Sequence, residues 1–423
     1  MSMMHKALPK VAVIHGEGSA SPLTVKAASV GICELIFLYA ACSDKDKAQF
    51  ALLKNHTRSF DISTLTDSEA AELLGKERIA GVVTFSESQL PRVTAYCAAL
   101  GLIGHSAETL ASLIDKYKQR ERLAEANVNA VRHALVDRQR VEQAVAVVGF
   151  PAVLKPRIGA GSRWTGKVAS MEELRHALSA GPADCEYVLE EYLEGDPELR
   201  DAFYGDYVSV ESVHQNGRSQ QVCVTAKLPL TEHFAETGMF VPHPLSAELA
   251  EQVCRLEAQA IQALGITDGV THTEIKLTSG GPRIIEINGR LGGYVPEIVK
   301  RAMNVDLVKA ALQVSLGIEP SIAPGPVTSV VYQVFLAAPC GQPAGFGGMD
   351  GMDEVLAMDG VLHLEITKDA GQVIDYRLGT QSNMGIVYGS APDFDAFART
   401  VHAMRTKLVP HLNVPGGREV DAR

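Results

Sequence analysis

Aromatic residues and paired cysteines are scarce in this sequence of 423 residues. Phe, Trp and Tyr together make up 6% of the chain, and Trp164 is the only tryptophan. The 7 cysteines stand singly, with no CxxC pair and an odd total, so the sequence predicts neither a zinc ribbon nor a disulfide framework. They are Cys33, Cys42, Cys97, Cys185, Cys223, Cys254 and Cys340. Unpaired cysteines are typical of a reducing compartment, and we expect a cytoplasmic protein.

Long basic runs and long apolar runs are also missing. The formal net charge is −11 and no cluster of Lys and Arg offsets it, so we expect no nucleic-acid partner. The most apolar segment, 30–42, contains Glu34 and is too short to span a bilayer. Residues 1–10 do not have the pattern of a signal peptide. The sequence therefore predicts no association with a membrane.

What is present is the composition of a globular protein with several domains. Hydrophobic residues make up 46% and charged residues 21%, and 423 residues exceed what one compact core normally holds. In the first half, short apolar runs alternate with segments of helical period, which indicates α/β units. From Asp206 the pattern turns to antiparallel strands, with a hairpin predicted around Asn216-Gly217. A small mixed unit is expected after the Pro-rich segment 319–326.

The most informative segment is a predicted hairpin, in which strand 271–277 and strand 283–288 flank the turn 279–281. A three-residue loop that contains glycine is a common hairpin connection. If the reversal is centred on Gly280, then Glu274 lies opposite Glu286. His272 and Asn288 form the next cross-strand pair on the same face.

Two carboxylates directly opposite each other repel, unless a cation lies between them. Mg²⁺ prefers one or two carboxylates together with substrate phosphates, and an Asn oxygen on the same face suits a second ion. Arg290, just past the strand, is placed to hold a phosphate or acyl-phosphate oxygen. The alternative is a surface hairpin with one solvated polar face.

A second candidate region is rich in glycine. Lys155 ends an apolar strand and is followed by the loop 157–163, whose glycines allow backbone N–H groups to approach phosphate oxygens. The spacing is neither that of a P-loop nor that of a dinucleotide fingerprint, and an ordinary turn is the alternative. Lys116 follows Asp115 at a helix start, where a solvated lysine is the simpler interpretation.

Taken together, these segments resemble the ATP-grasp superfamily of carboxylate–amine ligases. The resemblance covers about residues 112–318 and rests on Asp115-Lys116, the segment 151–156, the loop 159–163, the segment 189–195 and the hairpin strands through Arg290. The segments 207–211 and 271–276 are similar to L-amino-acid ligases that make dipeptides, bacilysin synthetase among them.

The resemblance implies an α/β (α+β) fold of the ATP-grasp type. It divides the chain into a Rossmann-like N-terminal domain at 1–110, a small lid subdomain at 111–187 with the glycine loop, a large subdomain at 188–320 with the metal-binding hairpin, and a small mixed domain at 321–423. The first domain is Rossmann-like in this family without binding a dinucleotide. Homodimers are common among such ligases.

The resemblance also implies roles for individual residues toward ATP and Mg²⁺ (or Mn²⁺). The metal ligands are Glu274, Glu286 and Asn288, and the groups expected to take part in catalysis are Arg290, Glu286 and Lys155. The residues expected to bind the phosphates, the adenine and the ribose are Lys116, Lys155, Gly159, Gly161, Ser162, Glu190, Glu191, Leu193 and Glu198. Asp206 is the alternative to Glu198 at the ribose.

The implied reaction joins two small amino-acid-like substrates through an acyl-phosphate, with release of ADP and phosphate. Glu236 would face the amino group of the first substrate, and Met239 stands where the dipeptide synthetase has a histidine. The full set expected at the substrates is Glu236, Met239, His272, Arg290, Gly292 and Gly293. Two alternatives stay open, namely an acceptor amine that is carrier-bound or not an amino acid, and a nucleotide-binding regulator without turnover.

Overall fold

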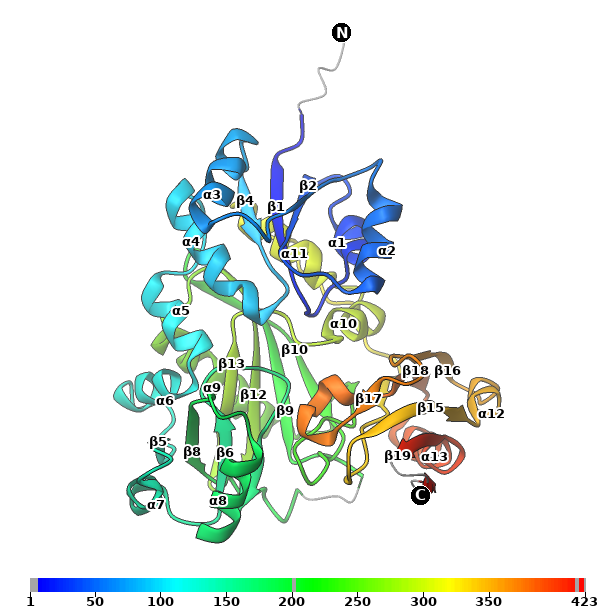
Figure 1. Ribbon diagram of the computed structural model, residues 1–423. Helices are drawn as coiled ribbons and strands as arrows, with labels where there is room; N and C mark the ends of the chain where they lie inside the picture. The colour runs from blue at the N-terminus through cyan, green and yellow to red at the C-terminus, as the bar shows by residue number, and fades with distance from the viewer. Residues whose placement is uncertain (1–6, 200–202, 415–417, 422–423) are drawn as a thin grey trace.

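The computed structural model describes residues 7–199, 203–414 and 418–421, which form four β-sheets with helices packed around them (Figure 1). Residues 1–6, part of the stretch without a signal-peptide pattern, lie outside the described residues. Among the described residues, no helix combines the length and the apolar character needed to cross a membrane.

The N-terminal unit is a parallel sheet in the order β3-β2-β1-β4, as expected for a Rossmann-like domain. Its strands are β1 (Lys10–His15), β2 (Glu34–Tyr39), β3 (Arg58–Asp61) and β4 (Gly81–Val83). Successive side chains of a strand point to opposite faces, so Val11 and Val13 of β1 enter one apolar core while Ala12 and Ile14 enter another.

Helices cover both faces of this parallel sheet. The first face holds α1 (Pro22–Ala28), α2 (Asp44–Leu53) and, from much later in the chain, α11 (Leu307–Ser315), and the second holds α3 (Asp67–Lys76) and α4 (Leu90–Leu100). Figure 1 shows α11 beside the blue N-terminal elements. Gly101 ends α4 with φ +65°, a conformation that glycine adopts without strain.

Two helices, α5 (Ala107–Ile114) and α6 (Lys116–Glu125), lead into a small antiparallel sheet of order β5-β8-β6-β7. Its strands are β5 (His133–Val136), β6 (Ala152–Pro156), β7 (Gly166–Val168) and β8 (Tyr187–Glu191). The helices α7 (Val141–Val148) and α8 (Met171–Ala180) bury their apolar residues against this sheet.

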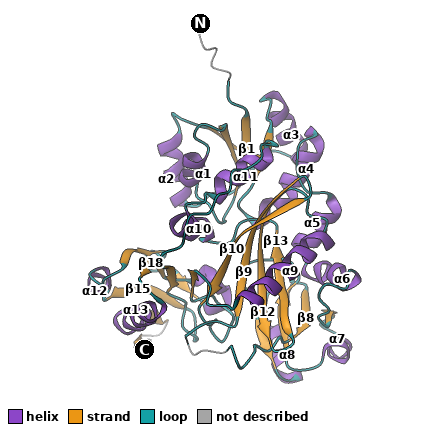
Figure 2. Ribbon diagram, turned by 180° about the vertical axis from the view of Figure 1, so that it is seen from behind, coloured by secondary structure: helices purple, strands orange, loops and turns teal. Residues whose placement is uncertain are grey.

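The large sheet is antiparallel and has the order β13-β12-β9-β10-β11-β14-β18-β16. The strands are β9 (Tyr207–Gln215), β10 (Arg218–Lys227), β11 (Gly238–Val241), β12 (Gly269–Thr278), β13 (Gly281–Asn288), β14 (Val330–Phe335), β16 (Val361–Ile366) and β18 (Gly385–Ala391). The helix α9 (Ala247–Ala263) packs on one face of β9, β12 and β13, and Figure 2 shows it crossing these strands. The helix α10 (Val295–Met303) contacts β11 and β14.

The C-terminal segment does not fold apart from the large sheet. Its strands β14, β18 and β16 extend that sheet, since β14 pairs with β11 from Gly238 to Val241. A second sheet has the order β17 (Val373–Ile374), β15 (Ala344–Asp350), β19 (Val409–Val414) and β20 (Arg418–Asp421). The helices α12 (Met352–Leu356) and α13 (Phe394–Lys407) pack on β14, β16 and β18 of the large sheet, and the 3-10 helix η2 (Tyr376–Ser382) follows β17. The predicted domain boundaries stay a prediction, although the sheet runs continuously across residue 320.

Candidate active site

The predicted hairpin is confirmed, including its register. Glu274 of β12 pairs with Glu286 of β13, and His272 pairs with Asn288. The connecting loop differs from the expected three residues, because Thr278 pairs with Gly281 and leaves a loop of two residues. A register shift beyond Glu274 restores the pairing of the two glutamates, since one residue of β13 bulges out of the ladder.

Cross-strand pairing places a band of polar side chains on one face of the large sheet. The face opposite to this band carries Val208, Val210 and Ile275, which pack under α9. Residues that pair across antiparallel strands share a face, so the register extends the band from strand to strand. Its members are Glu286, Asn288, His272, Glu274, Lys276, Tyr207, Ser209, Glu211, Thr225, Lys227, Met239 and Gln333.

Lys116, at the start of α6, lies against the carboxylate of Glu286. Its Nζ is 2.8 Å from Glu286 Oε1 and also donates to the carbonyl of Gly159 in the glycine loop. Burial alone would lower the pKa of Lys116, but the nearby Glu286 carboxylate raises it above its usual value. The ammonium group therefore stays charged between the β12–β13 hairpin and the glycine loop.

Asp115 fixes the position of Lys116. Its carboxylate caps α6 by accepting from the backbone N–H groups of Tyr117 and Lys118, and it also accepts from Arg157 at 2.7 Å. The backbone N–H of Lys116 donates to the carbonyl of Arg157 at 3.0 Å. These bonds tie the start of α6 to the end of β6, where Lys155 stands.

Lys155 belongs to a buried ion-pair cluster. Its Nζ is 2.9 Å from Glu190 Oε2, and the same oxygen is 2.8 Å from Arg120 Nη2. Burial would raise the pKa of Glu190, but Arg120 and Lys155 lower it to about 2. Arg120 also donates to the carbonyls of Ile284 and Ile285 at 2.7 Å each, which links the small sheet to β13.

Arg290 lies at the opposite end of the hairpin face. Its Nε is 3.0 Å from Glu87 Oε2, and its other nitrogens donate to Asn288 Oδ1 at 3.2 Å and to the carbonyl of Leu291 at 2.9 Å. Glu87 comes from the N-terminal unit, in the 3-10 helix η1 (Glu87–Gln89) after β4. Burial, with a contribution from Glu286, raises the pKa of Glu87 despite Arg290.

His272 joins the β12–β13 hairpin to a carboxylate of β9. Its Nδ1 is 2.9 Å from Glu211 Oε1, and its Nε2 is 3.4 Å from Glu274 Oε1. Burial would lower the pKa of His272, but Glu211 and Glu274 raise it to about 9. Glu274 in turn has its pKa lowered to about 2, against the effect of burial, mainly by His272. The backbone of Gly292 lies so close to His272 that an added Cβ would be 2.5 Å from Nδ1.

A buried ion pair lies farther along the same band. Lys227 Nζ is 2.8 Å from Glu236 Oε1, and the Lys227 side chain is fully buried. Met239 pairs with Lys227 across β10 and β11, so both occupy the same face. The structure therefore brings Glu236 and Met239, the residues predicted to face the substrate, to the band that includes Glu274 and Glu286.

The geometry agrees with the comparisons to known proteins. Residues 148–297 match the family profile of the ATP-grasp domain. The chain contains an ATP-grasp domain. The crystal structure of an L-amino acid ligase from Bacillus licheniformis has the same ATP-grasp fold, with a TM-score of 0.74 at 20% identity over 95% of this chain and 98% of that one.

Two curated relatives match over shorter parts of their own length. Alanine–anticapsin ligase of Bacillus subtilis is 26% identical over 58% of this chain and 55% of its own length. Carnosine synthase 1 of Homo sapiens is 30% identical over 44% of this chain and 23% of its own length. This chain thus spans only part of the length of the curated relatives it matches.

Some residues predicted for the ATP-grasp site lie at its edge. The side chain of Glu191 pairs with Arg132 at 2.8 Å, so it does not join the cluster around Glu190. Glu198 is exposed, whereas Asp206 lies beside Gly195, close enough that an added Cβ would be 2.1 Å from its Oδ2. Leu193 is half-buried and Gly293 is exposed. Gly159, Gly161 and Ser162 form the glycine loop with φ of +144°, +70° and +57°.

Four residues of this site were not predicted as site residues from the sequence. Glu87, Arg120 and Lys227 carry no motif, and Glu211 was noted only as part of a similar segment. One general signal was present for Glu87, because residues just past the carboxyl ends of parallel strands often line binding sites. Lys227 lies at the end of a strand whose alternation places it on the face of Glu274.

Proposed function

We propose that this chain is an ATP-dependent carboxylate–amine ligase that joins two amino acids or amino-acid-like molecules. The observation that carries the proposal is the meeting of Lys116, Lys155 and Arg290 with the carboxylate pair Glu274 and Glu286 in one site. Three cationic side chains suit the phosphates of a nucleoside triphosphate, and two facing carboxylates suit its metal ion. The named amino-acid ligases among the relatives support the same substrate class.

The donor set fits Mg²⁺. Glu274 and Glu286 face each other, and Asn288 offers an amide oxygen in the next cross-strand pair. The pKa of Glu274 is lowered to about 2, so this carboxylate stays ionised. Mg²⁺ held there would supply positive charge to the β- and γ-phosphates. Mn²⁺ has similar ligand preferences and is the alternative ion.

The proposed reaction has two steps. An oxygen of the substrate carboxylate attacks the γ-phosphorus of ATP, and ADP leaves. An amine nitrogen then attacks the acyl carbon, loses a proton and expels phosphate. Lys116 and Lys155 bind and orient the phosphates, while Arg290 holds the oxygens of the acyl-phosphate. The contribution of these side chains is alignment and charge neutralisation, as in other phosphoryl transfers.

Glu236 is proposed to receive the amino group of the first substrate. The carboxylate is half-buried on the face of the band, with Lys227 fixing one of its oxygens. A second oxygen remains for an ammonium group. Met239 lies on the same face and would border the substrate side chain, which favours an apolar side chain over a charged one.

Phosphate release from Mg-ATP tests the proposal. The full chain is assayed with pairs of L-amino acids, and the products are identified by mass spectrometry. We expect phosphate and a dipeptide only when both amino acids are present. Glu286→Gln should abolish both products, and Glu142→Gln, an exposed change in α7, should leave them unchanged.

Other results point to the alternatives. Phosphate release with a single carboxylate would indicate that the acceptor is a different amine, such as a carrier-bound one. ATP binding without any release of ADP across the panel would favour the non-catalytic regulator and refute the ligase. The proposed homodimer is checked separately by light scattering of the purified chain.

A further inference from the structure

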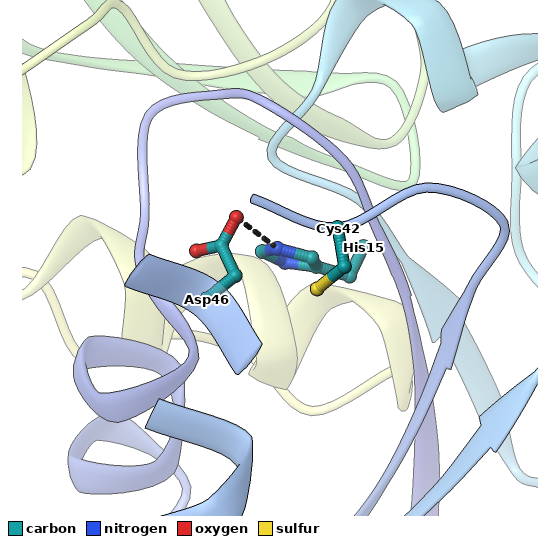
Figure 3. A group of neighbouring side chains, drawn as sticks. All are labelled: His15, Cys42 and Asp46. Atoms are coloured by element: carbon teal, nitrogen blue, oxygen red, sulfur yellow. Dashed lines mark ion pairs between the residues drawn. The ribbon is translucent and has the colours of Figure 1, made fainter. Parts of the chain in front are cut away.

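A group of three potential metal ligands lies outside the site described above, at the carboxyl edge of the parallel sheet. His15 is the last residue of β1, Cys42 follows β2, and Asp46 lies in the first turn of α2. Their ligand atoms all lie within 4.8 Å of one another. Figure 3 shows the carboxylate of Asp46 facing the ring of His15, with the sulfur of Cys42 beside them.

The fold itself brings these residues together. Strands β1 and β2 are parallel neighbours, so the segments that follow them start at the same edge of the sheet. Cys42 and Asp46 are four residues apart across the start of α2, where Ser43 caps the helix. The exposed fraction of His15 is 7%. Its ring packs edge-on against the ring of Phe50, with 5.3 Å between the ring centres.

The imidazole nitrogen is aimed into the group. His15 Nε2 is 3.2 Å from Asp46 Oδ2, but this nitrogen has no hydrogen-bond partner among the described residues. A buried polar atom without a hydrogen bond is costly, and a metal ion would satisfy it. Ligand atoms around a tetrahedral Zn²⁺ lie roughly 3.2–3.8 Å apart, which the His15–Asp46 distance matches.

We propose that His15, Cys42 and Asp46 form a Zn²⁺ site with one coordination position left for water or a further ligand. A neutral imidazole, a thiolate and a carboxylate carry two negative charges together, which one Zn²⁺ neutralises. The nitrogen, sulfur and oxygen donors are those that zinc accepts. Zinc binds the thiolate form of cysteine, so binding would release the Cys42 thiol proton to solvent.

The test uses Co²⁺ as a coloured substitute for Zn²⁺ on the full chain. A thiolate bound to Co²⁺ gives a charge-transfer absorption in the near ultraviolet, and Zn²⁺ should remove it by competition. The chain offers a matched control, because Glu232, His233 and Cys340 form a second, more exposed group of ligand atoms. We expect one Co²⁺ per chain, loss of the absorption in Cys42→Ser, and no change in Cys340→Ser.

Asp46→Asn is the second variant, and it should retain the absorption while weakening Zn²⁺ binding at least tenfold. Circular dichroism shows whether each variant is folded. Absorption that persists in Cys42→Ser, or that disappears in Cys340→Ser, would overturn the assignment. The same holds if the folded parent chain binds no Co²⁺ at micromolar concentration.

A second inference concerns the glycine loop, which docks on the C-terminal 3-10 helix η2. The backbone N–H of Trp164 donates to the carbonyl of Arg377 at 2.8 Å, and the backbone N–H of Thr380 donates to the carbonyl of Gly161 at 3.0 Å. The Arg377 guanidinium lies 5.1 Å from the centre of the Trp164 ring. Segments more than 200 residues apart thus form a specific contact.

Gly379 makes this contact close. It has φ +60°, and an added Cβ would be 2.0 Å from the carbonyl oxygen of Gly161. The helix η2 is itself held in place, because Ser382 Oγ donates to the carbonyl of Asp375 at 2.6 Å and Gln381 contacts Glu17 at 3.2 Å. The loop therefore rests on a fixed support.

We infer that Arg377, Gly379 and Thr380 are positioning residues that hold the glycine loop closed over the phosphates. This inference rests on the proposed ligase function. An acyl-phosphate is hydrolysed by water, so a closed loop directs the intermediate to the amine. A loosened loop would let water compete with the amine.

The measurement is the number of phosphates released for each amide bond formed. Gly379→Ala should raise this ratio at least twofold above the parent value and raise the KM for ATP severalfold. Gly371→Ala is the matched control, because Gly371 also has positive φ, +84°, but an added Cβ meets nothing within 4 Å. An unchanged ratio and an unchanged KM in Gly379→Ala would overturn the inference. Failure of the parent chain to form any amide would instead refute the ligase proposal.

Discussion

Glu190 lies between two cations, and its replacement by glutamine tests how strongly the site depends on this carboxylate. Its Oε2 is 2.9 Å from Lys155 Nζ and 2.8 Å from Arg120 Nη2, and all three side chains are buried. Glu190→Gln keeps the size of the side chain but removes its charge. We expect the variant to fold and to have a lower free energy of unfolding, because two buried cations lose their carboxylate.

Two arguments give the size of this loss. The pKa of Glu190 falls from 4.5 to about 2, which corresponds to about 3 kcal/mol in favour of the ionised form. Removal of one partner from a buried ion pair independently costs about 3–5 kcal/mol. Glu142→Gln is the control, since its pair with Arg175 is exposed at both side chains and such pairs contribute about 0–1 kcal/mol.

Urea unfolding followed by circular dichroism measures both variants, with and without saturating Mg-ATP. Without the nucleotide, Glu190→Gln should lose about 3 kcal/mol and Glu142→Gln less than about 1 kcal/mol. With the nucleotide, part of the first loss should be recovered, because the phosphates supply negative charge to Lys155. Equal losses in the two variants, or a loss in Glu190→Gln that Mg-ATP does not reduce, would refute the reasoning.

Three further predictions concern acid stability, ribose binding and catalysis. Burial lowers the pKa of His214 to about 4, so the unfolded chain binds a proton that the folded chain does not between pH 6.5 and 4. Stability should fall by about 3 kcal/mol as pH decreases through this window, and His214→Gln should remove that part of the pH dependence. Asp206→Asn should raise the KM for ATP at least tenfold, while Glu198→Gln leaves it unchanged. The reverse order would assign the ribose to Glu198. Arg290→Lys should keep ATP affinity but lower kcat about 100-fold, because lysine cannot reproduce the three directed contacts of the guanidinium. A KM change without a kcat change would contradict this role.

The hairpin shows both the strength and the weakness of the sequence argument. Alternation along strands fixes which residues share a face, so the pairing of Glu274 with Glu286 was predicted correctly. The connecting loop has two residues between Thr278 and Gly281 and was predicted to have three. A bulge in β13 compensates for this difference. Sequence patterns do not reveal bulges, because a bulge depends on what the extra residue contacts, here Arg120 through the carbonyl of Ile285.

The contacts that close the site were harder to predict, because they join segments far apart in the chain. Arg290 and Glu87 are separated by about two hundred residues, and nothing local marks Glu87 as its partner. Arg120 and Glu190 are 70 residues apart, and no local pattern pairs them. A short-range pattern predicts which side chains leave a strand on one face, but the choice of partner depends on how the sheets pack.

The pairing of charges suggests how the site changes when Mg-ATP binds. Each cation expected to meet a phosphate already contacts a carboxylate, since Lys116 lies against Glu286 and Lys155 against Glu190. Glu286 is also a predicted metal ligand, so Mg²⁺ would draw it from Lys116 and leave that lysine for a phosphate oxygen. Glu190 has no such second role, and it would keep Lys155 oriented while the phosphates bind. The metal and the nucleotide should therefore bind cooperatively through Glu286, and Glu286→Gln should remove this coupling.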